Sequence, residues 1–488
     1  MDKIARIKLL HTGIAGFDEI LGGGLPSGSL YLIQGLAGSG KTTLACQIGF
    51  LHAKQGEKVV ILTLIAESHV KMLNHFSNFS FFDESLVGER VMLFGGYASL
   101  AQEGLRGLLK LITGTLTKHK PGILIIDGFR SVRNSGPSDL DLAEFMHSLN
   151  SLVSSMVCTT FLISPVEGNV NDSENTLVDG VIELSQFHQG MRPIREIKVY
   201  KVRGVDHLLG KHVFKVNEDG IVIFPRIEAI STRANAAPAA STGHVSVGIP
   251  SWDKCIGGGV VRGSVTCLLG SPGVGKTLMG LHFIEQGLRD NEQCLVVGFD
   301  ESPKSLIAKG KKIGLELAPS VDDGNLEIMW YLPLELLIDD VASKMLDVIK
   351  QRSVTRLLID GLDGFRNIAA HPERVVSFLI ALMNELRVRG VTTFVTEQLP
   401  YFRGGFLNAD SFSSALYDNI MLLEYGRTDE ARFRKISVMK LRENGYEMLD
   451  HQFHISDAGI SVTHAEVAIT DGKSERSRQR GAADGKPE

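Results

Sequence analysis

Two short segments of the chain carry a motif that binds phosphate groups. Gly35–Thr42 and Gly270–Thr277 both follow the pattern G-x-x-x-x-G-K-[ST]. Glycines let such a loop curl so that its backbone N–H groups turn inward, toward phosphate oxygens at the N-terminus of the next helix. The lysine reaches the β- and γ-phosphates, and the Ser or Thr hydroxyl binds Mg²⁺. The chain is therefore predicted to bind a nucleotide and Mg²⁺ at two places.

Both loops stand in the sequence context that this chemistry needs. Ser29–Gln34 and Ser264–Leu269 precede them and are predicted to be short buried strands, and helical spacing follows the first loop. The predicted nucleotide-binding residues are Gly35, Gly38, Ser39, Gly40, Lys41, Thr42 and Thr43 in the first loop. In the second loop they are Gly270, Gly273, Val274, Gly275, Lys276, Thr277 and Leu278.

The chain repeats itself around these loops. Lys276 follows Lys41 by 235 positions, and Asp253 follows Asp18 by the same 235. Apolar segments that read as strands alternate with longer helical stretches in each copy, which predicts an α/β fold with a mostly parallel sheet covered by helices. Each copy is expected to close with a hairpin, at His212–Pro225 and at Gln452–Thr463.

These features predict the domain organisation. The stretch near residue 236 is small, polar and proline-bearing, as linkers are, and the C-terminal stretch is charged without an apolar period. The predicted parts are a first domain at 1–230, a linker at 231–243, a second domain at 244–465 and a disordered tail at 466–488.

Composition excludes several classes of protein. A net charge of −5 over 488 residues leaves no basic footprint for bulk nucleic-acid binding. The five cysteines show no C-x-x-C spacing, so neither zinc nor a disulfide framework is expected, and a reducing cytoplasm fits. We find no apolar run of membrane-spanning length and no signal core at the start.

Carboxylates follow several predicted strands, where the ligand crevice of an open α/β sheet lies. Asp127 and Asp360 each end an apolar segment and are candidate Mg²⁺ ligands, the alternative being helix caps. Glu67, Asp300 and Glu301 follow the second strand of each copy. They could orient or deprotonate an attacking water, although carboxylates are also common at helix N-termini.

A lysine and an arginine lie two positions apart near the end of each copy. Lys201 and Arg203 recur as Lys440 and Arg442, both 239 positions later, in predicted strands. Residues at i and i+2 of a strand project from one face, so each pair could reach the γ-phosphate in a neighbouring subunit. The alternative is the solvated face of an edge strand, where lysine discourages aggregation.

Together these motifs resemble the KaiC family of RecA-like ATPases. The likeness covers nearly all of residues 10–465, from the T-G-I-x-G-F-D opening at Thr12 to the K-x-R pairs. It implies tandem RecA-like P-loop domains, ATP as the nucleotide, and hexameric rings with nucleotide between adjacent subunits. It also implies that the K-x-R cations touch phosphate in trans, and that His207 contributes to the first nucleotide site.

The chain departs from the family pattern near the chemistry. Two adjacent glutamates usually follow the second strand, but here Ala66 precedes Glu67, and Asp300 precedes Glu301. The family's clock protein phosphorylates an adjacent serine and threonine in its second domain. Here Ser414 is followed by alanine, which makes Ser414 the candidate phosphosite, with Ser411 and Ser413 as neighbouring alternatives.

Several functions remain open from the sequence. The leading hypothesis is an oligomeric ATPase that acts as a regulatory or signalling switch, with a regulatory protein partner. The alternatives are a RecA-like DNA-dependent motor, a serine kinase acting on itself, and an ATP-binding scaffold with little hydrolysis. The net charge and the lack of an aromatic-basic strand-binding segment argue against the DNA motor.

Overall fold

The computed structural model describes residues 7–64, 69–135, 138–166, 176–234, 243–399, 416–427, 431–443, 445–447 and 449–464. Glu67, Ser411, Ser414 and the predicted tail lie outside these ranges. The described residues form two compact units. One takes those within 1–237, 333–347 and 365–385, and the other takes the remainder. Helix α8 (Ile227–Ala234) runs into the predicted linker, and the proposed domain boundaries stay a prediction.

The first copy is built on a sheet with nine described strands. Their spatial order is β11 (Gly220–Phe224), β10 (Lys211–Asn217), β9 (Arg192–Val202), β8 (Gly180–Gln189), β3 (Leu30–Gly35), β7 (Thr159–Ser164), β6 (Ile123–Asp127), β4 (Val59–Thr63) and β5 (Val91–Gly95). The strands from β8 to β5 run parallel, whereas β8, β9, β10 and β11 pair antiparallel. The mostly parallel sheet predicted from the sequence is confirmed.

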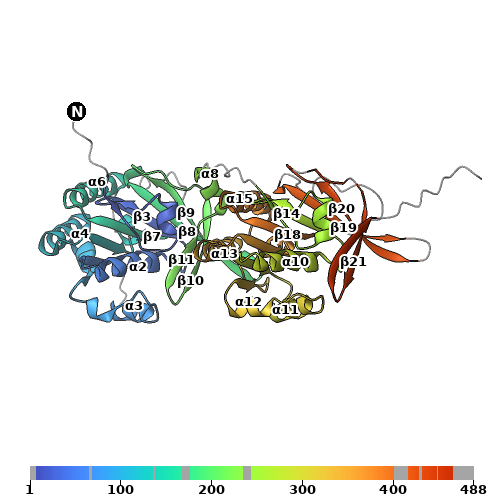
Figure 1. The fold of residues 1–488 in the computed structure, drawn as a ribbon. Coiled ribbons are helices and arrows are strands. Elements are labelled where there is room, and N and C mark those ends of the chain that lie inside the picture. The colour runs from blue at the N-terminus through green and yellow to red at the C-terminus, as the bar shows by residue number, and fades with distance from the viewer. Residues whose placement is uncertain are drawn as a thin grey trace, which may run out of the picture. The chain divides into compact units, whose positions relative to one another are not determined.

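Helices cover both faces of this sheet (Figure 1). Alternate residues of β3 point to opposite faces, as the pleat requires. Tyr31 and Ile33 pack in one core with residues of α2 (Lys41–Lys54), and Leu30 and Leu32 pack in another with residues of α4 (Tyr97–His119) and α6 (Asp139–Ser155). Because both faces are buried, these strands read as continuous apolar runs.

The remaining described elements of the first copy are short. They are β1 (Leu9–Leu10), α1 (Phe17–Ile20), β2 (Leu25–Pro26), α3 (His69–Phe76), a 3₁₀ turn (Glu84–Leu86) and α5 (Arg130–Ser135). Strands β1 and β2 pair with each other apart from the main sheet.

The second copy repeats the sheet strand for strand. Its described order is β16 (Leu326–Trp330), β15 (Cys294–Gly298), β17 (Arg356–Asp360), β18 (Thr392–Gln398), β14 (Val265–Gly270), β19 (Asn419–Arg427), β20 (Arg432–Lys440), β21 (His451–Ser456) and β22 (Gly459–His464). Strand β14 thus corresponds to β3, and β17 to β6. The repeat inferred from the two loops is therefore a repeat of the whole sheet.

Helix α10 (Lys276–Arg289) covers one face of the second sheet, where Phe283 stacks on Phe394 of β18 at 4.1 Å between ring centroids. The other described elements are β12 (His244–Val245), α9 (Pro250–Cys255), β13 (Val260–Val261), α11 (Pro303–Lys311), α12 (Ala318–Asp322), α13 (Ile338–Arg352), α14 (Asp363–Ile368), a 3₁₀ turn (Pro372–Arg374) and α15 (Val375–Val388). No helix among the described residues is both long and apolar enough to cross a bilayer.

Both predicted hairpins are confirmed as β10–β11 and β21–β22. The last strand of each hairpin is an edge strand, and two outward N–H groups in each already have acceptors. In β11, Ile221 N donates to Gln47 Oε1 at 2.8 Å and Ile223 N donates to Ala15 O at 3.2 Å. In β22, Ile460 N donates to His282 Nε2 and Val462 N to Ser251 Oγ.

Candidate functional site

Each phosphate-binding loop connects a central strand to a helix that starts at the motif lysine. Helix α2 begins at Lys41 after Gly40, and α10 begins at Lys276 after Gly275; both glycines have φ in the left-handed region, 100° and 117°. At the start of the first loop, a Cβ on Gly35 would lie 2.2 Å from Leu184 O of β8. Glycine is required at these points because a side chain would strain the backbone or collide with the next strand.

The two motif lysines bend back over their own loops. Lys41 Nζ donates to Leu36 O at 2.8 Å, while Lys276 Nζ donates to Gly270 O at 2.7 Å and Ser271 O at 2.9 Å. Burial lowers the pKa of both ammonium groups, and the carboxylate of the same site, Asp127 or Asp360, opposes that shift. A cation held this way over backbone N–H groups suits a phosphate chain.

The other predicted loop residues divide between the surface of the site and the core. Gly38 and Thr43 line the cavity described below. Ser39 is buried, and its Oγ has no hydrogen-bond partner among the described residues, which fits a hydroxyl placed at a phosphate-binding loop. In the second loop, the Val274 side chain is buried in the apolar core, so Val274 can contact a nucleotide only through its backbone, and the partly buried Leu278 packs against the same core.

The predicted metal ligands meet in pairs. Thr42 Oγ1 donates to Asp127 Oδ2 at 3.0 Å, and Thr277 Oγ1 donates to the two carboxylate oxygens of Asp360 at 3.0 and 3.1 Å. A hydroxyl and a carboxylate at this separation form an all-oxygen site that fits Mg²⁺, bound directly or through water. The pairing repeats although 85 and 83 residues separate the partners.

The two carboxylates differ in their surroundings. Asp360 Oδ1 also accepts a hydrogen bond from Thr396 Oγ1 at 2.8 Å, and the corresponding position in the first sheet is the apolar Ile163. Burial raises the pKa of Asp360, and nearby Glu301 and Asp300 raise it further, while the bonds from Thr396 and Thr277 lower it. In the second site two hydroxyl donors therefore favour the ionised form of a carboxyl whose burial disfavours it.

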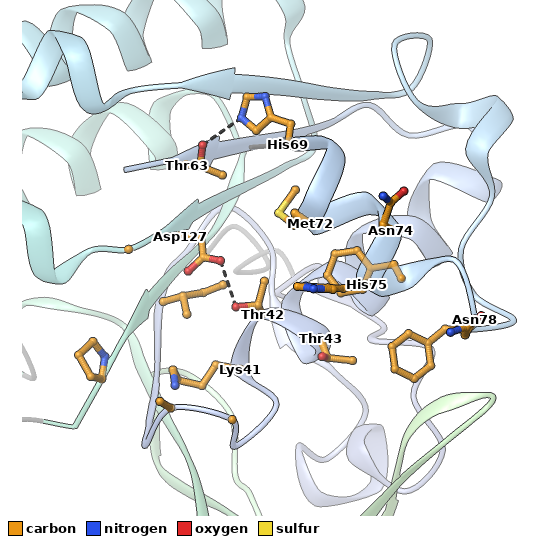
Figure 2. Close-up of a pocket in the computed structure, with 17 residues that line it drawn as sticks. Lys41, Thr42, Thr43, Thr63, His69, Met72, Asn74, His75, Asn78 and Asp127 are labelled. Carbon is orange, nitrogen blue, oxygen red and sulfur yellow. Dashed lines mark hydrogen bonds between the residues drawn. The ribbon is translucent and has the colours of Figure 1, made fainter. Parts of the chain in front are cut away.

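A cavity of about 770 Å³ opens beside the first loop. Figure 2 shows Lys41, Thr42 and Asp127 on one side of it and the side chains of α3 and the following turn on the other. The lining from that turn and helix combines apolar and amide groups: Met72, Asn74, His75, Phe76, Asn78 and Phe79. A volume of this size with a few convergent polar groups is typical of a small-molecule site.

His69 is a polar residue of this cavity that the sequence did not single out. It starts α3, and its Nε2 shares a hydrogen bond of 2.9 Å with Thr63 Oγ1 at the end of β4. Thr63 lies opposite Asp127 in the β4–β6 register. The sequence offered one indication of His69, its position two residues after Glu67, and His69 belongs to no recognised motif.

The candidate hydrolytic carboxylates of the second copy lie beside the metal-side aspartate. Asp300 is exposed and Glu301 is partly buried between β15 and α11. Ser302, not a carboxylate, caps α11 by accepting from Ser305 N, so a capping role does not account for Glu301. Glu301 instead accepts from Ser305 Oγ at 3.1 Å and forms an ion pair with Lys309. Glu67 lies outside the described residues.

The K-x-R pairs lie at the far end of the sheet from their own loops. Lys201 and Lys440 lie in β9 and β20, whereas each arginine follows its strand rather than lying within it. Arg203 pairs with Asp179 at 3.4 Å and Arg442 pairs with Asp418 at 3.1 Å.

Those two aspartates are anchored at the start of the central strands. Leu30 N, at the start of β3, donates to Asp179 Oδ2 at 3.0 Å, and Val265 N does the same to Asp418 at 3.0 Å. The phosphate loop begins five residues further along β3, roughly 16 Å at about 3.3 Å per residue. Each cation pair is therefore out of reach of its own nucleotide site.

His207 lies in the segment after β9, and its buried Nε2 has no hydrogen-bond partner in the described part of the chain. Tyr446, which stands at the position of His207 in the second copy, is half-buried. Among the described residues, no hydrogen bond joins either of them to the phosphate-binding loop of its own copy.

Comparison with known proteins agrees with this geometry. The family model for the KaiC ATPase matches residues 10–228 and again 245–467. The chain is 26% identical over 476 residues to the "Circadian clock oscillator protein KaiC" of Parathermosynechococcus lividus, covering 95% of this chain and 86% of that protein. It is also 26% identical to the "Circadian clock protein KaiC3" of Synechocystis, with 93% and 92% covered. With two tandem matches, two loops and one sheet order used twice, the chain belongs to the KaiC family of ATPases.

Proposed function

We propose that this chain hydrolyses ATP with Mg²⁺ as a homo-oligomeric ring, a hexamer by its family likeness, with nucleotide between adjacent subunits. The observation that carries the proposal is the separation of each K-x-R pair from its own phosphate loop. Each cation pair is repeated with the same aspartate partner and is out of reach of the nucleotide site in its own half of the chain. Such a pair is suited to act on phosphate held by a neighbouring subunit.

The charges at the pairs support this role. Burial, and then the adjacent arginine, lower the pKa of Lys201 and of Lys440. Arg203 and Arg442 remain substantially exposed, each with a side-chain exposure of 59%. Two cations held together and open to solvent suit an incoming polyanion, which would relieve their mutual repulsion.

Within one site the residues divide the work of hydrolysis. Lys276 and the loop backbone hold the phosphates, while Thr277 and Asp360 supply the oxygens of the metal site. Asp300 or Glu301 orients or accepts a proton from the attacking water, for which Glu301 must leave its ion pair with Lys309. In the first copy Glu67 is the proposed counterpart. Bound Mg²⁺ would neutralise phosphate charge.

The proposed biological role is a regulatory switch in the cytoplasm. Relatives of this chain are named circadian clock proteins, and ring assembly controlled by nucleotide would couple ATP turnover to a regulatory protein partner. Autophosphorylation of Ser414 is a further part of the proposal. Mass spectrometry after incubation with Mg-ATP tests it: phosphate at Ser414 that disappears in Ser414→Ala supports it, and an unmodified serine cluster contradicts it.

Mixing two defective variants tests the ring mechanism. One variant carries Lys41→Ala and Lys276→Ala, which removes nucleotide binding but keeps the arginines. The other carries Arg203→Gln and Arg442→Gln, which keeps both loops. Each variant alone should be inactive. Co-expressed variants should regain hydrolysis, because the arginines of the lysine variant then face the loops of the arginine variant where the two kinds of subunit meet.

Mass in solution with and without ATP gives the second measurement. An ATP-dependent increase in mass is expected for the wild type and for the arginine variant, but not for the double lysine variant. No recovery of activity in the mixed assemblies, or full turnover by a monomer, would contradict action in trans. Unchanged ATP stoichiometry in the double lysine variant would overturn the loop assignments.

A further inference from the structure

A thiol, an imidazole and a carboxylate from separate parts of the second copy meet away from the nucleotide sites. Cys255 ends α9, His451 begins β21, and Glu447 lies in the segment between β20 and β21. One ligand atom from each of the three residues lies within 4.8 Å of the other two. We propose that Cys255, His451 and Glu447 form a zinc-binding site. This inference is independent of the proposed ATPase mechanism.

The donors are close enough together to share one ion after a local adjustment. One donor atom from each residue lies within 4.8 Å of the others. Cys255 Sγ lies 3.9 Å from His451 Nδ1, whereas Glu447 Oε2 lies 3.7 Å from the other ring nitrogen, Nε2. Ligand atoms at about 2.0–2.3 Å from a tetrahedral zinc are separated from one another by roughly 3.3–3.7 Å. An ion shared with Cys255 would use Nδ1 of the imidazole, so the Glu447 side chain, which is 44% exposed, would rotate from the Nε2 side of the ring toward that ion.

The surrounding packing fixes two of the donors. Cys255 and His451 are buried, and the ring of Trp252 packs edge-on against the imidazole at 5.6 Å between centroids. The backbone N–H of Glu447 donates to Cys255 O at 3.2 Å, which ties the segment of the third donor to the end of α9. Packing of this kind limits the reorganisation that metal binding would need.

The donor chemistry selects the ion. A thiolate and an imidazole are soft or borderline ligands that favour zinc over Mg²⁺, which takes oxygen ligands. Three protein ligands leave one tetrahedral position for water on the exposed side, where Glu447 meets solvent. Binding Zn²⁺ would release the thiol proton of Cys255, which now donates to Ser251 O. Cysteine spacing alone predicted no zinc site, because 196 positions separate the cysteine from the histidine.

A titration of the full-length chain with Co²⁺ tests the site. The protein is first treated with chelator and kept free of nucleotide, so that the phosphate loops do not take up metal. One equivalent of Co²⁺ should produce the sulfur-to-cobalt charge-transfer absorption of a thiolate ligand, and Zn²⁺ should displace it. Zn²⁺ should also raise the melting temperature, since the three donors come together only in the folded chain.

Three single variants identify the ligands. Cys255→Ser should remove the charge-transfer band, and His451→Gln and Glu447→Gln should each weaken Zn²⁺ binding by at least about tenfold. Cys158→Ser, a buried thiol in the first copy, is the control and should leave the titration unchanged. Glu447→Gln alters an exposed side chain, so it remains informative if the buried variants fail to fold.

Two results would overturn the proposal. One is the absence of a stoichiometric charge-transfer band in the wild type. The other is a combination of two findings: Glu447→Gln binds Zn²⁺ as tightly as the wild type, and the cobalt charge-transfer band persists in Cys255→Ser.

Discussion

Asp418 joins Arg442 to the first residue of the central strand: it accepts from the arginine at 3.1 Å and from Val265 N at 3.0 Å. Asp179 joins Arg203 and Leu30 in the same way. The aspartate thus fixes where the arginine leaves the sheet. Asp418 also accepts from Arg387 Nε at 2.8 Å, so one carboxylate holds two arginines with different exposure.

These two arginines should respond differently to substitution. Arg442 is exposed, and exposed ion pairs contribute about 0–1 kcal/mol to stability. Arg442→Gln should therefore leave unfolding nearly unchanged. In a Lys41→Ala background, which isolates the second site, it should lower ATP turnover at least roughly tenfold, because the proposed transition-state cation is lost. Arg387→Gln, which removes a mostly buried partner, should destabilise the second unit instead. Turnover by Arg442→Gln equal to wild type would argue for a purely structural pair.

Urea unfolding can be followed selectively in the second unit, because both tryptophans of the chain, Trp252 and Trp330, belong to it. This probe serves the arginine comparison and the two stability predictions below. The first copy contributes no tryptophan signal, so its unfolding does not distort the measurement.

Loss of the Thr396 hydroxyl should make the second nucleotide site more sensitive to acid. Thr396→Val removes a hydrogen bond that favours the ionised carboxylate, so the pKa of Asp360, already raised by burial, rises further. Mg²⁺ needs the carboxylate. Mg-dependent ATP binding, measured in a Lys41→Ala background, should then be lost at a higher pH as pH falls. The control is Ile163→Val in the first copy, and coinciding pH midpoints would count against the role of Thr396.

His282 should make the second unit lose stability in acid. Burial lowers the pKa of His282 to about 4, with Arg289 adding to the shift, and its Nε2 accepts from Ile460 N at 3.2 Å. Protonation therefore favours the unfolded chain, and stability present above pH 6.5 is lost as pH falls toward 4, on the order of 3 kcal/mol. Urea midpoints between these pH values measure this loss.

His282→Gln keeps an oxygen acceptor without the titration, so its stability should vary less over the same pH range. His454→Gln changes an exposed histidine of β21 and should follow the wild type. A His282→Gln curve parallel to the wild-type curve would show that His282 is not the acid-sensitive group.

Arg356 should be a main support of the second unit. It is 1% exposed and donates to Glu292 Oε2 at 2.6 Å, to Asp290 Oδ2 at 2.8 Å and to two backbone oxygens. Arg356→Met leaves these acceptors without their donor and should cost about 3 kcal/mol. Arg262→Gln, which removes a more exposed partner of Glu292, should cost less than about 1 kcal/mol. Equal losses of unfolding free energy in the two variants would mean that the burial of Arg356 adds nothing to the stability of the second unit.

The sequence predicted those features that depend on neighbouring residues. A glycine loop, an apolar strand before it and an aspartate at a strand end each appear within a few positions, so Lys41, Thr42 and Asp127 were found and meet in one site. The repeat then predicted the second copy. The strand order of the sheet repeats with it, although only the alternation of elements was inferred.

Features that depend on distant contacts were missed. The hydrogen bond from Thr396 to Asp360 joins two strands, and the contact between Cys255 and His451 joins residues 196 positions apart. No spacing rule detects either. The arginines of the K-x-R pairs were placed within strands because alternation alone cannot show where pairing stops. It stops at Val202 in the first copy and at Lys440 in the second.

The occupied N–H groups of β11 and β22 limit how copies of this protein can associate. With Ile221, Ile223, Ile460 and Val462 already donating to acceptors in their own unit, these edges offer no ladder for a foreign strand to extend. Contacts between protein molecules at these edges must use side chains, and such contacts separate far more readily than the strands of a continuous sheet. Such joints can open and close within a turnover cycle, and the occupied donors also make β11 and β22 poor templates for fibrous growth.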